Sequence, residues 1–520
     1  KSAKTPKTVK AETVITAPKP KAAPRVAMSP EAAVKAKELL DQILAHPEDR
    51  SVRLIYADLL GELGDPRGEF IVQHCALADL DPLDARYPAA LASVRRTEVT
   101  YGRSWFSDYA KRTKLGPEDS PRAEFDRNLN ARFSGGMLQR IAMRPEDIAA
   151  EWSRLRAREP IEGIELLAGE GLMSEHKTLR EPADFAVLKI TPSGWFTSHS
   201  VADVLAWGMP KLRVLELSGC DLGVRGAQLI ANQDTDLGEH YDEYRKPPPF
   251  ADGQLEELSL SGGGITDEGA RLVFAAPHLE RLRALDLMRC GLTATSLVAL
   301  REAPAMHGLR RLGLAGNNEL GAQLGELAGW EALPQLEALA LPQATTAAAL
   351  AAMFPRPSSS LRELVLASAK ELAQWPGLVG VAEALVELDI GTTSLGDDRW
   401  TALLAAPSAR TLVHLHANGC SLSDAAIDAL VASALDRLVT LDLSSNKLTD
   451  RGLAALAAWP GLQHVTHVRI NNNRKVTEAG LVALANTTQF QPARFEIGKL
   501  GDAKITARLC ERFGDALVAG

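Results

Sequence analysis

Three histidines in the C-terminal third of the chain lie among acidic residues at spacings that could support metal or proton chemistry. The pairs Glu387/Asp389, His414/His416, Thr440/Asp442 and His467/Arg469 occupy the same two positions in four successive copies of one repeated pattern. If these copies form neighbouring strands, side chains in one row lie about 5 Å apart. Three imidazoles beside carboxylates suit a zinc ion or a pH-sensitive contact. A surface of complementary charges accounts for the same residues without a metal, and we expect no metal and no cofactor.

Motifs of the common enzyme classes are absent from the sequence. It contains no P-loop, no His-Glu-x-x-His, no Gly-x-Ser-x-Gly and no paired Cys-x-x-Cys. This absence favours a binding function, and we expect a protein that is not an enzyme.

The repeated pattern is Leu-x-x-Leu-x-Leu-x-x-(Asn/Cys)-x-Leu, and it predicts the elements that must position these residues. Six of the ten steps between its eleven starts are 27 residues long, a period typical of a solenoid. Apolar positions 1, 4, 6 and 11 are expected to turn inward, because one repeat alone cannot bury its hydrophobic side. The starts are Phe185, Leu212, Leu255, Leu282, Leu309, Leu336, Leu361, Leu385, Leu412, Leu438 and Val465.

After several strands the sequence predicts a helix that begins near a threonine. Thr266, Thr449 and Thr477 are each followed by an acidic residue, so they are expected to cap helices that end near residues 276, 458 and 486. A strand, a turn and a full helix in 27 residues resemble leucine-rich repeats of the ribonuclease-inhibitor-like class. The resemblance implies an α/β horseshoe over residues 185–490, with parallel strands on the concave side and helices outside. The sixth and seventh repeats are poorer, and we expect irregular turns there without a break in the stack.

Two units precede the repeats. Residues 1–30 hold seven basic residues, one acid and five prolines, which predicts a disordered Lys/Pro/Ala-rich linker. Its net charge of +6 leaves −14 for the rest of a chain whose total is −8. The linker could join another domain, contact nucleic acid weakly through phosphates, or act only as a solvated spacer.

Residues 31–115 predict a small all-α module. The segment from Leu39 to Ile71, which includes Arg53-Leu-Ile-Tyr-Ala-Asp-Leu-Leu and Gly64-Asp-Pro-Arg-Gly-Glu, resembles the repeat-companion domain that precedes repeat arrays in large bacterial proteins of the myxobacterial type. That family implies an accessory module without activity. Its clustered charges suggest an ion-pair network and not a catalytic site.

Both ends of the solenoid are expected to carry caps. Residues 116–184 predict an N-terminal cap with degenerate repeats, in which Phe133–Ile141 forms a first strand and Ile161, Ile164 and Leu166 mark a repeat. Residues 491–520 predict a C-terminal cap, with Phe495–Ile497 as the last strand and residues 505–517 as an amphipathic helix.

Positions 3, 5 and 7 of each strand are expected to point out of the concave face. Seven acids and two arginines occupy these positions, so we expect an acidic strip that attracts a basic protein partner and disfavours nucleic acid. Small residues between Gly313 and Ala367 could receive an apolar anchor, or could only permit tight curvature. The candidate partner-binding residues are Glu216, Glu257, Asp286, Arg311, Glu363, Glu387, Asp389, His414, His416, Asp442, His467 and Arg469.

An insertion adds two further candidates. The step from Leu212 to Leu255 is 43 residues long. Its residues 233–252 contain Tyr241 and Tyr244 among six acids, which suits either a partner-binding loop or a disordered excursion.

Composition sets the remaining expectations. Three of the five cysteines, Cys220, Cys290 and Cys420, occupy the Asn position of the repeat, where neighbours are too far apart for a disulfide. Free thiols indicate a reducing cytoplasm, and no apolar window is long enough for a membrane span. The sequence therefore predicts a non-enzymatic, cytoplasmic scaffold that binds a protein. The alternative is a regulator of a partner enzyme, as in inhibitors of ribonucleases or activators of small GTPases.

Overall fold

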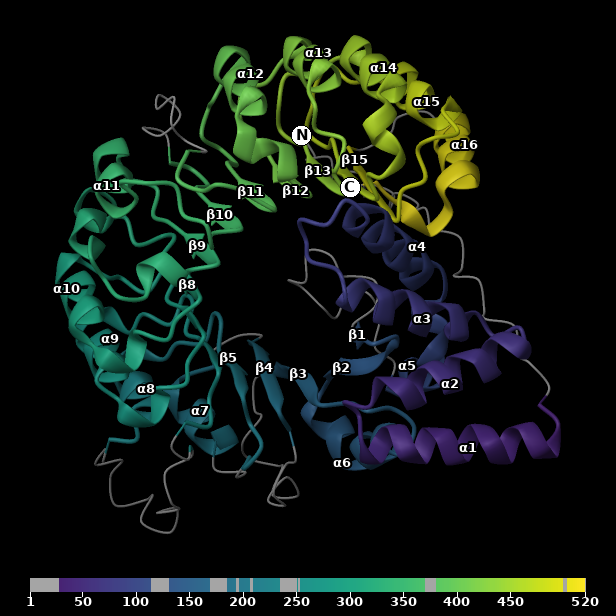
Figure 1. Cartoon of the computed structure of the whole chain (residues 1–520), viewed down its shortest axis with the longest axis horizontal. Coiled ribbons are helices and arrows are strands. Elements are labelled where there is room, and N and C mark those ends of the chain that lie inside the picture. The colour runs from purple at the N-terminus through teal and green to yellow at the C-terminus, as the bar shows by residue number, and fades with distance from the viewer. Residues whose placement is uncertain are drawn as a thin grey trace, which may run out of the picture.

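The computed structural model describes residues 28–113, 131–168, 185–192, 196–205, 209–233, 250, 253–369, 380–498 and 503–519. The described strands form one 16-stranded sheet in sequence order. Figure 1 shows a horseshoe, with the strands on its inner side and helices on its outer rim. The predicted α/β leucine-rich repeat solenoid with a preceding all-α module is confirmed.

The strands are β1 (Ala131–Ser134), β2 (Met137–Met143), β3 (Gly163–Ala168), β4 (Val187–Pro192), β5 (Val214–Glu216), β6 (Glu257–Ser259), β7 (Ala284–Asp286), β8 (Arg311–Gly313), β9 (Ala338–Ala340), β10 (Glu363–Val365), β11 (Glu387–Asp389), β12 (His414–His416), β13 (Thr440–Asp442), β14 (His467–Arg469), β15 (Arg494–Ile497) and β16 (Leu517–Ala519). The helices are α1 (Pro30–Ala45), α2 (Arg50–Glu62), α3 (Pro66–Ala78), α4 (Tyr87–Trp105), α5 (Ser107–Thr113), α6 (Pro145–Arg156), α7 (Ser198–Leu205), α8 (Gly223–Ile230), α9 (Thr266–Phe274), α10 (Ala294–Glu302), α11 (Ala347–Met353), α12 (Asp397–Ala405), α13 (Asp424–Ala432), α14 (Asp450–Ala458), α15 (Glu478–Asn486) and α16 (Ala503–Phe513).

Buried leucines of successive repeats form one continuous core from β1 to β16. The prediction that the poorer repeats do not interrupt it is confirmed, because β9, β10 and β11 pair in parallel with continuous register. The fifth repeat replaces its outer helix by a 3-10 helix over Gly321–Leu327.

Polar side chains link each turn to the next. Asn317 accepts hydrogen bonds from the backbone N–H groups of Cys290 and Leu292, and it donates to the carbonyl oxygens of Leu287 and Leu314. Cys420 occupies the same position and makes a simpler contact, with its Sγ 3.0 Å from the carbonyl oxygen of Ile390. Each link satisfies backbone groups that would otherwise be buried without partners.

The outer helices interlock through their first turns. Thr449 and Thr477 cap α14 and α15 as predicted, and each also bonds back to an aspartate of the preceding helix. Asp424 accepts from the Thr449 N–H at 2.8 Å and from its hydroxyl at 2.5 Å. The cap prediction at Thr266 is wrong, because this residue lies inside α9 with φ of 59° and Ile265 precedes it as the cap position.

The N-terminal cap differs from its prediction. Residues 133–141 do not form a single strand but belong to an antiparallel hairpin of β1 and β2, which turns at Gly135 and Gly136. Both glycines have positive φ, and a Cβ on Gly136 would lie 2.4 Å from the Cα of Ile71. This close approach lets the hairpin pack on α3. The degenerate repeat predicted at Ile161–Leu166 is confirmed as β3, which pairs in parallel with β2 and β4.

The C-terminal cap also contains more than predicted. β15 forms where Phe495–Ile497 predicted a strand, but it is not the last one. The following helix ends at Phe513 instead of Leu517, and residues 517–519 form β16 beside β15.

The helical module α1–α5 lies across the opening of the horseshoe, between its first strands and its C-terminal repeats (Figure 1). On the N-terminal side, Tyr109 donates a 2.6 Å hydrogen bond to the carbonyl oxygen of Ala142, and Arg67 pairs with Glu159 at 2.5 Å. On the other side, α4 packs against the C-terminal repeats. The module therefore converts the horseshoe into a closed ring.

Candidate functional site

The concave face has the side-chain rows that the repeat pattern predicts. Asp389, His416, Asp442 and Arg469 are paired across β11–β14, and so are Glu387, His414, Thr440 and His467. The two halves of this face nevertheless differ in what covers them.

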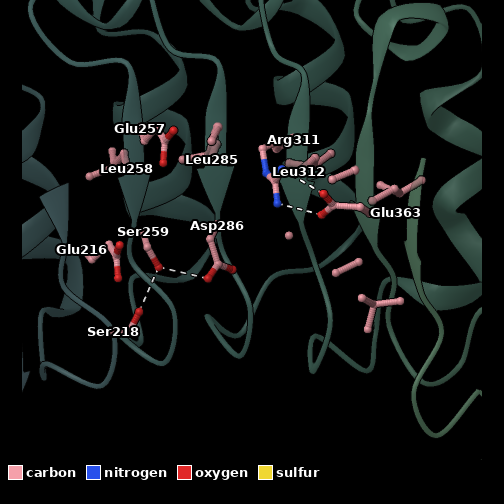
Figure 2. A pocket seen from close by; sticks show the side chains of 16 residues that line it. Glu216, Ser218, Glu257, Leu258, Ser259, Leu285, Asp286, Arg311, Leu312 and Glu363 are labelled. Carbon is pink, nitrogen blue, oxygen red and sulfur yellow. Dashed lines mark hydrogen bonds and ion pairs between the residues drawn. The ribbon is translucent and has the colours of Figure 1, made fainter. Parts of the chain in front are cut away.

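Strands β5–β10 line an open hollow of about 320 Å³. Figure 2 shows Glu216, Glu257 and Asp286 on one side of it and the pair Arg311–Glu363 on the other. The hollow is also lined by small or apolar side chains and by leucines of the strands. The small or apolar residues include Gly313, Ala338, Ala340 and Val365. The predicted small-residue segment therefore forms part of a real depression.

Four acids and one arginine set the charge of this hollow. Arg311 donates two hydrogen bonds to the carboxylate of Glu363, at 2.7 and 3.1 Å. Glu216 pairs with Arg140 at 3.1 Å and lies 3.7 Å from Lys189. Glu257 is exposed and has no ion-pair partner among the described residues. Glu257 is therefore the acid that is most available to a ligand.

Asp286 lies at one end of a short polar chain in the hollow, which runs from Ser218 through Ser259 (Figure 2). Its carboxylate accepts hydrogen bonds from the Ser259 hydroxyl and the Met288 N–H, both at 3.0 Å. Burial raises the pKa of this carboxyl, although both hydrogen bonds oppose the shift. A cation placed beside Asp286 would stabilise its charged form.

Strands β11–β14 are covered by α4 and the segment before it. Leu83, Tyr87 and Leu91 pack against three buried valines, Val386, Val413 and Val439. As a result, three predicted partner-binding residues are buried, with exposed fractions of 9% for His416, 5% for Asp442 and 6% for His467.

Arginines fix the edges of this contact. Arg96 donates to the carbonyl oxygens of Gln463 and Gln491, both at 2.9 Å. From the other side, Arg437 donates to the carbonyl oxygens of Pro82 and Asp84, also at 2.9 Å. Each bond joins backbone groups to a charged donor, so the contact has a defined geometry.

Arg95 of α4 contacts two histidines of the predicted cluster, His467 directly and His414 through Thr440. Its Nη1 donates to the Thr440 hydroxyl at 2.9 Å and lies 3.3 Å from Nδ1 of His467. His414 Nδ1 lies 2.8 Å from the same hydroxyl. Because Nδ1 of His467 and Nδ1 of His414 face a guanidinium and a hydroxyl, the zinc alternative loses its geometric basis. Among the described residues, no group of three or more His, Cys, Asp or Glu side chains could hold a metal ion.

The remaining candidates on the covered half are held by neighbours. Arg469 lies 3.2 Å from Glu496 and 3.5 Å from Asp442. Glu387 lies 3.8 Å from His416 Nε2. Burial raises the pKa of Glu387, although His416 opposes the shift. Asp389 accepts from the N–H of Gly391 at 2.8 Å.

The sequence contains a signal for the covered half that strand positions 3, 5 and 7 do not reveal. Position 2 of the repeat is a valine in three of the four repeats that α4 covers, those of β11, β12 and β13. In the six preceding repeats the same position is charged, with Arg213, Glu256, Arg283, Arg310, Glu337 and Arg362. This change from charge to valine marks the surface on which another element packs.

Two other predictions concern parts of the molecule outside this face. Tyr241 and Tyr244 lie outside the described residues. Within the helices that are described, none is long and apolar enough to span a membrane.

Comparison with known proteins agrees with the repeats. The model of a family described as Leucine Rich repeat matches residues 208–231, 255–273 and 438–457. No curated protein matches the chain. Among solved structures, the chain is similar to one in the crystal structure of the yeast Rad7 and Elc1 complex, with 17% identity and a TM-score of 0.37. That match covers 57% of this chain and 87% of the other.

Proposed function

We propose that this protein is a non-enzymatic scaffold that binds a basic segment of a protein partner in the open hollow of β5–β10. The observation that carries the proposal is the unpaired, exposed Glu257 beside a partly buried Asp286, above a floor of small residues. A lysine or arginine side chain matches this arrangement, because its stem covers apolar surface while its charge meets the acids.

Glu216, Arg311 and Glu363 complete the proposed site as its rim. The exposed Arg311–Glu363 pair can exchange partners when a charged ligand enters, since exposed pairs contribute little stability on their own. The Glu216–Arg140 pair is part-buried. Glu387 and Asp389 border the site where α4 begins to cover the face. We further propose a cytoplasmic location, which the five free cysteines support. Residues 31–115 are proposed to be the repeat-companion module.

A displayed library of random peptides, selected on the full chain, tests the proposal. Enriched peptides should carry net positive charge. Their affinity should fall steeply as the salt concentration rises from roughly 50 to 200 mM. Glu257→Lys should weaken binding about tenfold, which corresponds to about 1.4 kcal/mol. The matched control is Glu268→Lys, because Glu268 is also exposed but lies on α9, on the outer rim of the same repeat.

Neutral or acidic peptides, or equal effects of the two variants, would rule out recognition of basic segments in this hollow. Once a partner protein is known, its catalytic rate with and without the scaffold separates pure recruitment from the regulator alternative.

A further inference from the structure

We propose that the contact between α4 and the C-terminal repeats is a proton-sensitive latch, which opens the ring when His414 and His467 become protonated. This inference is independent of the proposed function, because the latch residues lie on β11–β14 and not in the open hollow. It is based on hydrogen-bond directions around Arg95.

The first step concerns His467. A guanidinium has N–H donors and no acceptor, so an unprotonated Nδ1 on His467 is the form that accepts from Arg95 Nη1 at 3.3 Å, and the Thr466 hydroxyl, 3.0 Å away, can donate to the same nitrogen. Protonation would place an N–H group and a positive charge against the guanidinium. The attraction between α4 and β14 would then become a repulsion.

The second step concerns His414. The Thr440 hydroxyl accepts from Arg95, so its own hydrogen is free to be donated to Nδ1 of His414 at 2.8 Å. A proton on that Nδ1 would leave the hydroxyl hydrogen without its acceptor. The relay from Arg95 through Thr440 to His414 therefore requires a neutral imidazole.

The surrounding positive charges also oppose protonation of the two histidines in the closed ring. Burial, together with Arg95 and His416, holds the pKa of His414 well below its usual range. Burial, with Arg95, Arg494, His414 and Arg469, does the same for the pKa of His467. Asp442 and Glu496, on the strands beside the two rings, both pair with Arg469. The charged and titratable groups on the elements around the two rings are Tyr87, Arg95, Arg96, Glu98, Tyr101 and Arg103 of α4, Glu387 and Asp389 of β11, His416 of β12, Asp442 of β13, Arg469 of β14, and Arg494 and Glu496 of β15.

The third step is that opening is local. The module is anchored to the other end of the ring by separate contacts, which include Arg67–Glu159 and Tyr109–Ala142. Loss of the α4 contact would therefore free the ring at one seam and leave the solenoid core in place. The exposed seam would then present Val386, Val413 and Val439.

Hydrogen exchange of the full chain measures the latch directly. Exchange of α4 amides is compared with that of α9, which lies away from the seam and corrects for the effect of pH on intrinsic exchange. In the open state each histidine has its ordinary pKa of about 6.5. Protonation of each histidine should therefore raise the equilibrium constant for opening about tenfold at pH 5.5 relative to pH 7.5. The expected increase is about 100-fold for α4 and none for α9.

His414→Asn and His467→Asn keep an acceptor oxygen near the Nδ1 position and cannot be protonated in this range. Each single variant should retain about a tenfold response, and His307→Asn, which lies beside Glu331 away from the seam, should retain the full response. If a histidine variant does not form the α4 contact at pH 7.5, the α4/α9 exchange ratio of the wild type decides the proposal by itself. An α4/α9 ratio that does not rise at pH 5.5, or that rises equally in both histidine variants and the wild type, would overturn the latch.

Discussion

Arg95 and His467 lie 372 residues apart in the chain, yet Nη1 of the arginine is 3.3 Å from Nδ1 of the histidine. This contact joins the N-terminal module to the eleventh of the repeats that follow the cap. It also divides the concave face into a covered half and an open half. The molecule is consequently a ring with one exposed concave surface and not an open horseshoe.

Val413→Arg should release α4 without harming the repeat. Six other repeats carry a charged residue at the equivalent position, so the strand tolerates it, whereas burial of a guanidinium beneath Leu83, Tyr87 and Leu91 costs about 2 kcal/mol or more. Faster exchange of α4 amides at pH 7.5 is the expected result. Arg310→Val is the control, because α4 does not cover that repeat. Unchanged α4 protection in Val413→Arg would show that the valines do not hold the module.

Asn317→Ala should lower the free energy of unfolding by about 3 kcal/mol, because four backbone partners of a buried amide lose their hydrogen bonds. Asn317→Cys should cost less, since cysteine occupies this position in three other repeats and bonds to a carbonyl oxygen. Urea denaturation of both variants measures the difference. Equal losses would mean that the thiol does not substitute for the amide.

Removal of the charge at Asp424 should make stability less sensitive to acid. Partial burial opposes the charge, but hydrogen bonds from Thr449 hold the pKa of Asp424 below its usual range. A lowered carboxyl pKa contributes stability above the unfolded value of about 3.9, and this contribution disappears as the pH falls through the folded value. Asp424→Asn should therefore be less stable than the wild type by about 1–2 kcal/mol at pH 7, and the gap should close near pH 2.

Denaturation at a series of pH values tests this expectation. Asp428→Asn is the matched control, because Asp428 is on the same helix but half exposed, and within the described part of the chain its one ion pair is with Arg451. A gap for Asp424→Asn that stays constant from pH 7 to pH 2 would contradict the assignment.

Arg67→Met should destabilise the protein by about 3 kcal/mol. Arg67 is half-buried and Glu159 is buried, with side-chain exposures of 13% and 10%, so the substitution leaves a buried carboxylate without its cation. Arg50→Met removes the exposed pair with Asp79 and should cost less than about 1 kcal/mol. Chemical denaturation compares the free energies of unfolding of the two variants. Similar losses would show that the Arg67–Glu159 pair contributes no more stability than the exposed Arg50–Asp79 pair.

Sequence periodicity accounts for most of the correct predictions. The repeat starts predicted the order of the strands, the lateral rows across β11–β14 and the continuous core, because each repeat contacts only its neighbours. The errors occurred where this local rule ends. The glycines of the β1–β2 hairpin permit a turn that the apolar pattern alone conceals, and β16 is a short pairing beyond the last repeat.

What the sequence determined by itself is therefore the solenoid and the residues on its concave face, since both follow from a 27-residue spacing. What only the tertiary structure decided is which of those residues remain accessible. The curvature accumulated over all the repeats brings β13 and β14 back to α4, and no local pattern specifies that sum. Only the valines at position 2 show in sequence where the ring closes, and their partner is more than 300 residues away.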